Sequence, residues 1–397
     1  MTIINKIAFL VHEPIMYAHY SSVWAAMDRS AFTIVLLNAF VHDGREIATG
    51  VEECIEKIRS LGYEYVYFDD LLRRGVKYKY VVSNHGMGGS SVYPTTKLAK
   101  KMRNFCKHVI NRARGWVGRG ERYAISFWDP VQYIPLQAGI KQVRFMYGAD
   151  IGEGWSLQPW NEIYDLFLCH GPNDEAAIRN RFRGKTAVMG YPRYDEYFNQ
   201  DLDIDSVVAE FGIDPSKKTI LWISTTGAGA TSIPAFASLI AGLMGQYNVI
   251  ARPHPIAFRA EPRNVELLRS LKFKIDSTAL RDMNRLYKAV DLVLCDYGGS
   301  AFSVIYLGKK LILLDVPGSE KCPWLLNTSN FELHELAPVV GTQDFQNIYN
   351  MIPDEKLWDE WARRRTILFN KYFADYRGIS SLKAAEILGR LDSLIGH

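Results

Sequence analysis

Short apolar runs, rich in β-branched and aromatic residues, alternate along the chain with segments whose apolar residues have helical spacing. Such runs are typical of buried parallel strands, and the alternation predicts an α/β protein whose sheets are covered by helices on both faces. The expected strands are Ile7–Val11, Phe32–Leu37, Tyr63–Phe68, Tyr78–Ser83, Tyr123–Phe127, Val143–Tyr147, Asp165–Cys169 and Thr186–Met189, then Thr219–Ser224, Tyr247–Arg252, Phe273–Asp276, Leu292–Asp296 and Leu311–Asp315.

These two sets of strands predict two Rossmann-like domains. The polar segment 199–218 contains an Asp-Pro pair and separates the sets, so we expect the boundary there. The expected first domain covers residues 1–200 and the second covers residues 215–375. A final segment, 376–397, carries a helix expected over Ser381–Ile395. Two placements of this helix are open. It packs on the second domain, or the chain crosses back and the helix packs on the first domain.

Composition and charge exclude several classes of protein. The chain has 397 residues, of which 48% are hydrophobic, and 47 Lys and Arg against 43 Asp and Glu give a formal net charge of +4. That charge is far too small for a dedicated nucleic-acid binder, so we expect no nucleic-acid partner. No apolar run reaches the roughly 18 residues of a membrane span, and the N-terminus lacks a signal-peptide pattern, so we expect a cytoplasmic protein. The cysteines lack CxxC spacing, and no metal site is expected.

The strongest local signal is DLVLCDYGGSAFSVIYLG, over 291–308, where a strand leads through two glycines into an apolar helix. Glycines allow a tight turn, and the free N–H groups of the first helical turn favour a phosphate. The alternative is a simple strand-to-helix turn with a serine N-cap. The candidate residues for phosphate binding are Asp296, Gly298, Gly299 and Ser300.

Two further strand ends in the second half carry polar residues. IARPHP, over 250–255, ends a strand with Arg252 and His254, where ligands bind at the carboxyl edge of a parallel sheet. Arg252 is suited to clamp a phosphate and His254 to donate a proton or hydrogen bond to a leaving phosphate oxygen. Ser224 and Thr225 follow another strand in a hydroxyl-rich turn that suits a nucleotide phosphate. Structural roles remain the alternative for each.

In the first half, glycine-rich loops follow the strands that end near Ser83 and Tyr147. His85, Asp150 and Glu153 are the groups in these loops that can accept a proton from an acceptor hydroxyl. His12 and His19, after the first strand, are candidates for the same cleft or for packing. Ordinary turns between strand and helix are the alternative reading of both loops.

The segment Lys97–Arg119 contains eight basic residues and no acidic one, with apolar residues at helical spacing. A basic amphipathic helix suits an anionic membrane surface or a polyanionic acceptor. The alternative is a core-packed helix with a basic outer face.

The motifs GYPRYDEYF, ILWIST, IARPHP and DYGGS, in this order, resemble the CDP-glycerol glycerophosphotransferase family, which builds teichoic acids and related capsular polymers. The resemblance extends from about Tyr164 to the C-terminus. It implies a GT-B fold, in which two Rossmann-like doubly wound domains face each other across a cleft. It also implies a nucleotide-activated donor that is CDP-linked, and no bound cofactor. By position, it implies that Arg252, His254, Asp296, Gly299 and Ser300 bind the donor pyrophosphate, with Ser277 a further candidate on the nucleotide side.

The chain departs from the family where a first-domain motif, WHGTPLK, aligns best with residues 146–150. Tyr147 then stands in place of a histidine thought to be the base. A neutral tyrosine has a pKa near 10 and is a poor base at pH 7. Either His85 or, second, Asp150 takes that role, or the acceptor and reaction differ from the teichoic-acid type. His12, Tyr147 and Glu153 are expected on the acceptor side.

The hypothesis is a transferase, cytoplasmic and peripheral on the inner face of the membrane, that adds a polyol phosphate from a CDP-polyol such as CDP-glycerol to a hydroxyl of a glycan, polymer or lipid-linked acceptor. One alternative is a GT-B glycosyltransferase that uses a nucleotide sugar for capsule or lipopolysaccharide synthesis. A second is a non-catalytic protein that binds a glycan or polyanion.

Overall fold

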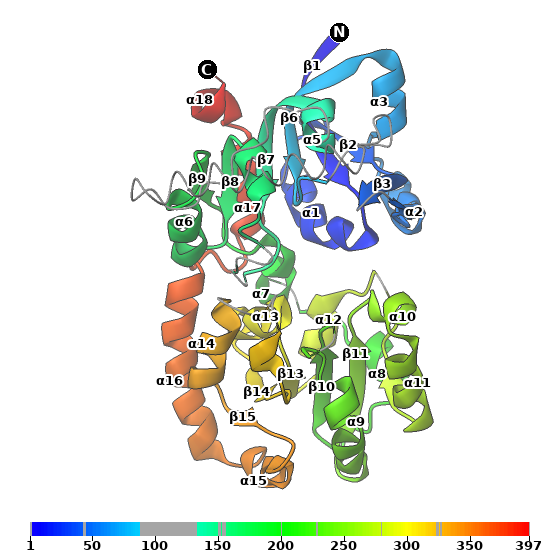
Figure 1. Ribbon diagram of the computed structural model, residues 1–397, viewed down its shortest axis with the longest axis vertical. Helices are drawn as coiled ribbons and strands as arrows, with labels where there is room; N and C mark the ends of the chain where they lie inside the picture. The colour runs from blue at the N-terminus through cyan, green and yellow to red at the C-terminus, as the bar shows by residue number, and fades with distance from the viewer. Residues whose placement is uncertain are drawn as a thin grey trace.

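The computed structural model describes residues 2–42, 45–87, 133–149, 152, 156–199, 201–227, 229–278, 280–322, 325 and 328–396. The predicted strand Tyr123–Phe127, the basic segment Lys97–Arg119, and the candidates Asp150 and Glu153 lie outside these residues. Figure 1 shows two α/β domains one above the other, with both ends of the chain on the first domain.

The first domain is built on a seven-stranded parallel sheet with the order β5-β2-β1-β6-β7-β8-β9. The central strands carry the buried apolar runs that the sequence predicts. The winding of the chain reverses between β1 and β6, which makes this pair the topological switch point of the sheet. The strands are β1 (Thr2–Val11), β2 (Phe32–Leu36), β5 (Tyr65–Tyr67), β6 (Val76–Ser83), β7 (Gly139–Phe145), β8 (Leu166–Cys169) and β9 (Lys185–Val188).

Helices cover both faces of this sheet, as expected for parallel strands. On one face, Tyr20 and Trp24 of the first helix pack edge-on against Phe9 of β1. A two-stranded antiparallel hairpin, which the sequence pattern does not predict, lies outside the main sheet. These elements are α1 (Pro14–Ala26), α2 (Glu52–Ser60), α3 (Phe68–Arg74), α5 (Ile134–Ala138), α6 (Pro172–Arg179) and α7 (Asp195–Asn199), with the hairpin strands β3 (Ala39–His42) and β4 (Arg45–Ala48).

The second domain has a six-stranded parallel sheet with the order β12-β11-β10-β13-β14-β15. In chain order this is 3-2-1-4-5-6, the order of dinucleotide-binding domains, with the switch point between β10 and β13. The strands are β10 (Thr219–Ser224), β11 (Asn248–Pro253), β12 (Lys274–Ile275), β13 (Leu292–Cys295), β14 (Lys310–Leu314) and the unpredicted short β15 (Val339–Val340).

Helices also flank the second sheet, and one of them is buried along nearly its whole length. From Ala301 to Leu307 every residue of α13 is buried, and its first turn opens toward the first domain. The helices are α8 (Asp205–Phe211), α9 (Ile233–Ala241), α10 (Ala257–Ala260), α11 (Pro262–Ser270), α12 (Met283–Lys288), α13 (Gly299–Leu307), α14 (Ser329–Leu336) and α15 (Ile348–Met351).

The end of the chain returns from the second domain to the first along α16 (Glu355–Tyr372), as Figure 1 shows. The helix expected over Ser381–Ile395 is two helices, α17 (Ser380–Leu388) and α18 (Leu391–Ile395). Their apolar residues belong to the same buried cluster as β1. No helix in the described part of the chain is both long and apolar enough to cross a membrane.

Candidate functional site

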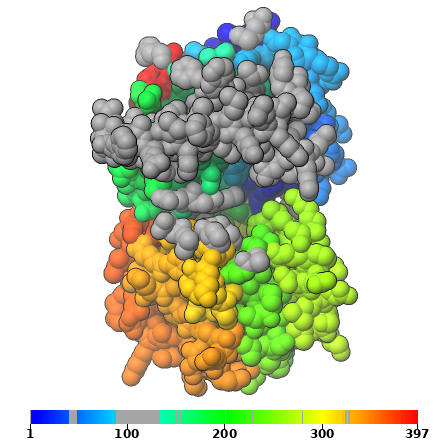
Figure 2. All heavy atoms as spheres, viewed as in Figure 1, coloured from blue at the N-terminus to red at the C-terminus, as the bar shows by residue number. Residues whose placement is uncertain are grey.

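The carboxyl edges of the two sheets meet at the domain boundary. Tyr191, which follows β9, has its hydroxyl 3.3 Å from the carbonyl oxygen of Tyr147 and 3.2 Å from the hydroxyl of Ser303 in α13. Glu13 follows β1, and the charge of Arg259 in α10 acts on its carboxyl group from the other domain. Figure 2 shows a hollow at this boundary. The two switch points therefore face the same space.

On the second-domain side, the first turn of α13 forms a site suited to an anion. Gly298 precedes the helix with a φ of +101°, a conformation that side chains rarely allow. The helix has no side-chain cap, and Gly298, Gly299 and Ser300 are half-buried. The hydroxyl of Thr225 lies 3.6 Å from the place that a Cβ of Gly298 would occupy. The uncapped N–H groups of the helix start, the helix dipole and the hydroxyls of Thr225 and Ser300 favour a phosphate here.

Asp296, a predicted phosphate-binding residue, is hydrogen-bonded instead to the protein's own loops. One carboxylate oxygen accepts from the N–H groups of Thr225 and Tyr297, at 2.7 and 2.8 Å. The other accepts from the N–H and the hydroxyl of Ser232, at 2.7 and 2.8 Å. Burial raises the pKa of Asp296 to about 6. Because protein donors occupy both oxygens, Asp296 fixes the loops after β10 and β13 and is a positioning residue.

Arg252 is buried at the end of β11 and forms an ion pair with Asp276, which follows β12. Its guanidinium also donates to the carbonyl oxygen of Thr278 at 3.3 Å. Arg281 binds the same carboxylate, at 2.9 Å, and Glu210 at 2.5 Å. Burial lowers the pKa of Arg252, Asp276 opposes that shift, and the charge of Arg193 makes a smaller contribution in the same direction as burial. Arg252 is thus held rigidly at the sheet edge.

His254 is exposed next to this pair, and its main-chain N–H donates to the carbonyl oxygen of Ser224 at 3.0 Å. Its Nδ1 accepts from the N–H of Ile256 at 3.2 Å, so a neutral ring carries its proton on Nε2. Desolvation by the surrounding protein, followed by the charge of Arg252, lowers the pKa of His254. His254 is therefore a neutral hydrogen-bond donor at neutral pH.

The remaining donor-side candidates differ in exposure. Ser224 is buried as the last residue of β10. Ser277 is exposed in the turn after β12, next to Asp276. Of the two, only Ser277 is exposed.

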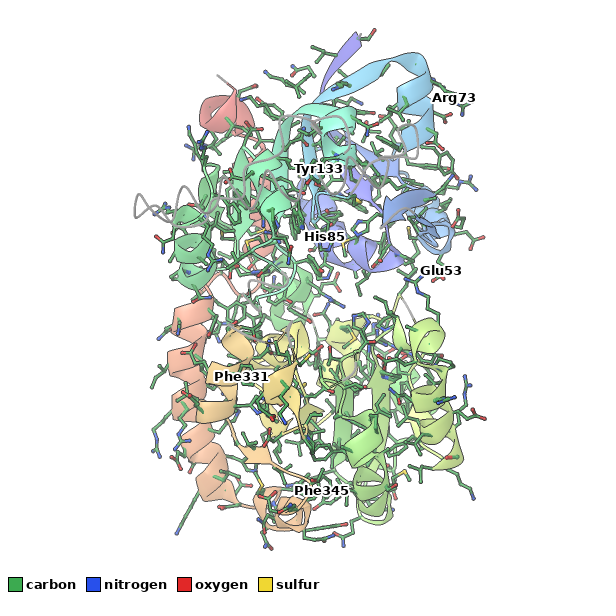
Figure 3. All side chains as sticks on the ribbon, viewed as in Figure 1. Glu53, Arg73, His85, Tyr133, Phe331 and Phe345 are labelled. Atoms are coloured by element: carbon green, nitrogen blue, oxygen red, sulfur yellow. The ribbon has the colours of Figure 1, made fainter. Side chains whose placement is uncertain are left out.

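On the first-domain side, the structure brings His85 and Tyr147 together from the ends of β6 and β7. The Nε2 of His85 lies 3.1 Å from the hydroxyl of Tyr147. The rings of His12 and Trp160 flank the imidazole at centroid distances of 5.5 and 5.4 Å. Figure 3 labels His85 in the half of the first domain nearer the second. A Cβ on Gly86 would come within 2.8 Å of Trp160, so the chain needs glycine there to place His85.

Burial keeps these imidazoles neutral. Burial, and then the charges of His12 and Arg144, hold the pKa of His85 well below its usual value. Burial alone lowers the pKa of His12 to about 4. His12 was predicted to lie on the acceptor side. It is only 4% exposed, and its ring packs beside that of His85. His85 is thus neutral at pH 7 in the ligand-free protein.

Arg193 also reaches this boundary, although the strand pattern does not single it out. Its Nη1 donates to the Nε2 of the buried His19 at 3.2 Å. Its carbonyl oxygen accepts from the side chain of Asn284, in α12 of the second domain, at 3.2 Å. The signal that could have found it is the motif GYPRYDEYF, in which Arg193 is the basic residue.

The rest of that motif joins the two ends of the fold. Gly190 has a φ of +80° and approaches Ser380 so closely that a Cβ would lie 2.4 Å from its hydroxyl. That hydroxyl accepts from the N–H of Tyr191 at 3.0 Å. Asp195 caps α17 by accepting from the N–H groups of Ser380 and Ser381. GYPRYDEYF and the closing RGISS segment are therefore one structural unit, which fixes the position of Arg193.

A buried pair lies close to this unit. The Nδ1 of His170, at the end of β8, is 2.7 Å from a carboxylate oxygen of Asp174, and both side chains are fully buried. The ring of His170 packs against that of Tyr191 at 4.6 Å. The pair therefore lies where the chain returns to the first domain, and the carbonyl oxygen of His170 accepts from the N–H of Ala374 there at 2.9 Å. Within the described residues, no three His, Cys, Asp or Glu side chains gather in a way that could hold a metal ion.

The family of CDP-glycerol:poly(glycerophosphate) glycerophosphotransferases matches residues 93–377 of this sequence, well over half of its length. The chain belongs to this family. The predicted resemblance is thus confirmed, and membership identifies the protein as a transferase. No curated protein sequence matches the chain.

Similar solved structures have low sequence identity. The wall teichoic acid polymerase TagF is 12% identical, with a TM-score of 0.59 over 99% of this chain and 90% of that chain. A UDP-N-acetylglucosamine 2-epimerase is 14% identical, with a TM-score of 0.55 over 99% and 97%. The Staphylococcus aureus MnaA structure with UDP is 13% identical, with a TM-score of 0.55 over 99% and 98%. These similarities confirm the predicted fold of two Rossmann-like domains of the GT-B type.

Proposed function

We propose that this glycerophosphotransferase-family member transfers a polyol phosphate from a CDP-polyol, such as CDP-glycerol, to a hydroxyl of a cell-surface polymer or glycan. The observation that carries the proposal is the pairing of two unlike switch points across the domain boundary. The second domain presents uncapped N–H groups, Arg252 and His254, which suit the phosphates of a nucleotide. The first domain presents a neutral imidazole, His85, which suits a proton acceptor.

In the proposed reaction, the acceptor hydroxyl oxygen attacks the phosphorus that carries the polyol. A new P–O bond forms to the acceptor, and the bond from that phosphorus to the bridging oxygen breaks. CMP leaves with the electron pair, and the proton of the hydroxyl goes to His85. This in-line displacement needs positioning and charge stabilisation rather than covalent participation of the protein.

The ligand-free environment makes His85 a weak base, because burial and the positive charge of Arg144 disfavour the imidazolium. A bound donor brings two negatively charged phosphates to the same boundary. Opposite charge favours the protonated ring, so the donor itself raises the pKa of His85 toward neutrality. The base is therefore strongest when the donor is in place, which limits wasteful activation of the acceptor.

The donor side stabilises the departing CMP. Negative charge develops on the bridging oxygen as its bond to phosphorus breaks. Arg252, the Nε2–H of His254 and the N–H groups of Gly299 and Ser300 are suited to neutralise that charge. Because Asp276 and Asp296 hold these groups in place before the donor binds, little reorganisation is needed.

The test is release of CMP from CDP-glycerol in the presence of a glycerophosphate-primed acceptor, followed by 31P NMR. CDP-ribitol and UDP-N-acetylglucosamine serve as competing donors. We expect a CDP-polyol to be consumed with a new phosphodiester signal. Consumption of the UDP-sugar alone would instead identify a glycosyltransferase and contradict the proposal.

We also propose that the protein works on the cytoplasmic face of the membrane, where the segment Lys97–Arg119 binds anionic lipid. The absence of acidic residues from this segment supports the proposal. Replacing Lys100, Lys101, Arg103 and Lys107 by Gln should reduce co-sedimentation with phosphatidylglycerol vesicles at low salt. Unchanged co-sedimentation would contradict it.

A further inference from the structure

Arg193 differs from the other arginines at the domain boundary in its partners. Arg281 binds the carboxylates of Asp276 and Glu210, and Arg252 also binds Asp276. Arg193 donates to a neutral imidazole and lies 5.6 Å from the ring of Tyr194, and the described residues provide it with no carboxylate. Among the described residues, its positive charge is therefore not paired with a carboxylate.

The neutral partner of Arg193 is itself costly to bury. His19 is 2% exposed, and its Nε2 accepts from the guanidinium, so the proton of the neutral ring is on Nδ1. That Nδ1 is buried with no partner in the described part of the chain. An unpaired buried donor costs about 1–3 kcal/mol, and an apolar side chain would avoid that cost. The contact with Arg193 accounts for a histidine at this position.

The main chain of Arg193 is tied to the second domain, on which Arg252 lies. Its carbonyl oxygen accepts a hydrogen bond from the side chain of Asn284 in α12. Asp282, the N-cap of this helix, ends the loop whose residues Asp276 and Thr278 bind Arg252. Burial lowers the pKa of Arg252, and the charge of Arg193 adds to that shift against the charge of Asp276. Two guanidiniums that repel each other across a domain boundary are stabilised by an anion between them.

We propose that Arg193, held by His19, binds the phosphate of the donor that is farther from the nucleoside. This is the phosphoryl group transferred in the proposed function, on which the inference rests for its ligand. The groups of the second domain then bind the phosphate next to the nucleoside. Each phosphate is thus bound by a different domain, and Arg193 is a substrate-binding residue for the group that moves.

The test compares a nucleoside diphosphate with its monophosphate, so it requires no acceptor and no turnover. In isothermal titration of the full chain, we expect CDP to bind more tightly than CMP. Arg193→Gln should reduce the affinity for CDP about 10- to 100-fold, the effect of losing a charged hydrogen bond, and leave that for CMP within about twofold. Arg193→Lys, which keeps the charge without the fork, should give an intermediate loss.

Two further variants separate binding from general charge or folding effects. Arg259→Gln removes an exposed positive charge at the same boundary and should leave the ratio of CDP to CMP affinity unchanged. His19→Phe should lower the ratio, and His19→Gln, whose amide oxygen can accept from Arg193, should restore most of it. Unfolding temperatures show which variants are folded.

Equal weakening of CDP and CMP by Arg193→Gln, or no weakening of either, would contradict the inference. If the chain prefers uridine nucleotides, the proposed function fails, and the same comparison with UDP and UMP still decides the role of Arg193. A chain that binds no nucleoside diphosphate contradicts both.

Discussion

The two switch points occupy equivalent places in two sheets of similar topology, yet their chemistry differs. Around the β10–β13 switch point, Arg252 is paired with Asp276 at the ends of β11 and β12, and the start of α13 has no side-chain cap. At the ends of β1 and β6, the ionisable groups are the buried His12 and the half-buried His85, whose pKa values desolvation lowers. The second-domain site is thus built from paired charges and main-chain donors, and the first-domain site from neutral rings.

The largest effect that sharpens this comparison is expected at His85. His85→Asn should reduce turnover about 10²- to 10⁴-fold, the usual contribution of a general base, without changing the affinity for CMP. Tyr147→Phe removes only a hydrogen-bond partner of His85 and should reduce turnover less than tenfold. Steady-state CMP release measures both. Full activity of His85→Asn would transfer the role to another group, with Asp150 the next candidate.

The next effect concerns acid stability. His12 is neutral in the folded protein until its pKa of about 4, whereas it takes up a proton near pH 6.5 when unfolded. Because the unfolded state binds more protons between these values, stability is lost as the pH falls from 6.5 to 4, by about 3 kcal/mol.

Urea unfolding of His12→Asn at several pH values checks this effect, since the variant should show a flatter curve in that range. Asp296, whose pKa burial raises to about 6, acts with the opposite sign: its contribution is lost as the pH rises from 4 to 6. Asp296→Asn should therefore steepen the acid loss. Identical slopes in wild type and His12→Asn would contradict the burial of His12 as a neutral ring.

A smaller effect is expected to distinguish Arg252, which is paired with a carboxylate, from Arg193, which contacts a neutral imidazole. Arg252→Met leaves Asp276 buried with Arg281 as its remaining charged partner, so the free energy of unfolding should fall by about 2 kcal/mol, less than the usual 3–5 for a fully orphaned charge. Adding Asp276→Asn should recover part of that loss. Arg193→Gln breaks no ion pair among the described residues and removes one hydrogen bond to His19, so it should lower stability by about 1 kcal/mol. Equal losses for both arginines would remove the distinction.

The smallest effect is expected at the helix start. Ser300→Ala removes one hydroxyl from the proposed phosphate site and should weaken CMP binding about fivefold, consistent with about 1 kcal/mol for one hydrogen bond. Ser270→Ala, at an exposed position on α11, is the matched control. Titration with CMP measures both, and an unaffected Ser300→Ala would place the phosphate away from the start of α13.

The fold was largely predictable because burial in parallel sheets forces continuous apolar runs. The expected Ile7–Val11 and Thr219–Ser224 coincide with the buried parts of β1 and β10. The β3–β4 hairpin and β15 were not predicted, because strands of two to four residues are too short for a hydrophobic pattern to single them out. The helix expected over Ser381–Ile395 divides near Gly389, a break that its periodicity does not reveal.

The candidate site was less predictable, for a physical reason. Motifs such as GGS record a local backbone requirement, visible in one stretch of sequence. The contact of His85 with Tyr147, and that of His19 with Arg193, join residues more than 60 positions apart. Burial, which neutralises the histidines and turns Asp296 into a positioning residue, likewise arises only from tertiary packing.

The most direct test of the division between the two domains is isothermal titration of the wild-type chain, His254→Ala and His85→Asn with CDP, UDP, GDP and CMP. The account predicts selective binding of the cytidine nucleotides, weakened at least tenfold by His254→Ala and unchanged by His85→Asn. Preference for UDP or GDP, or a loss of binding in His85→Asn with none in His254→Ala, would contradict it.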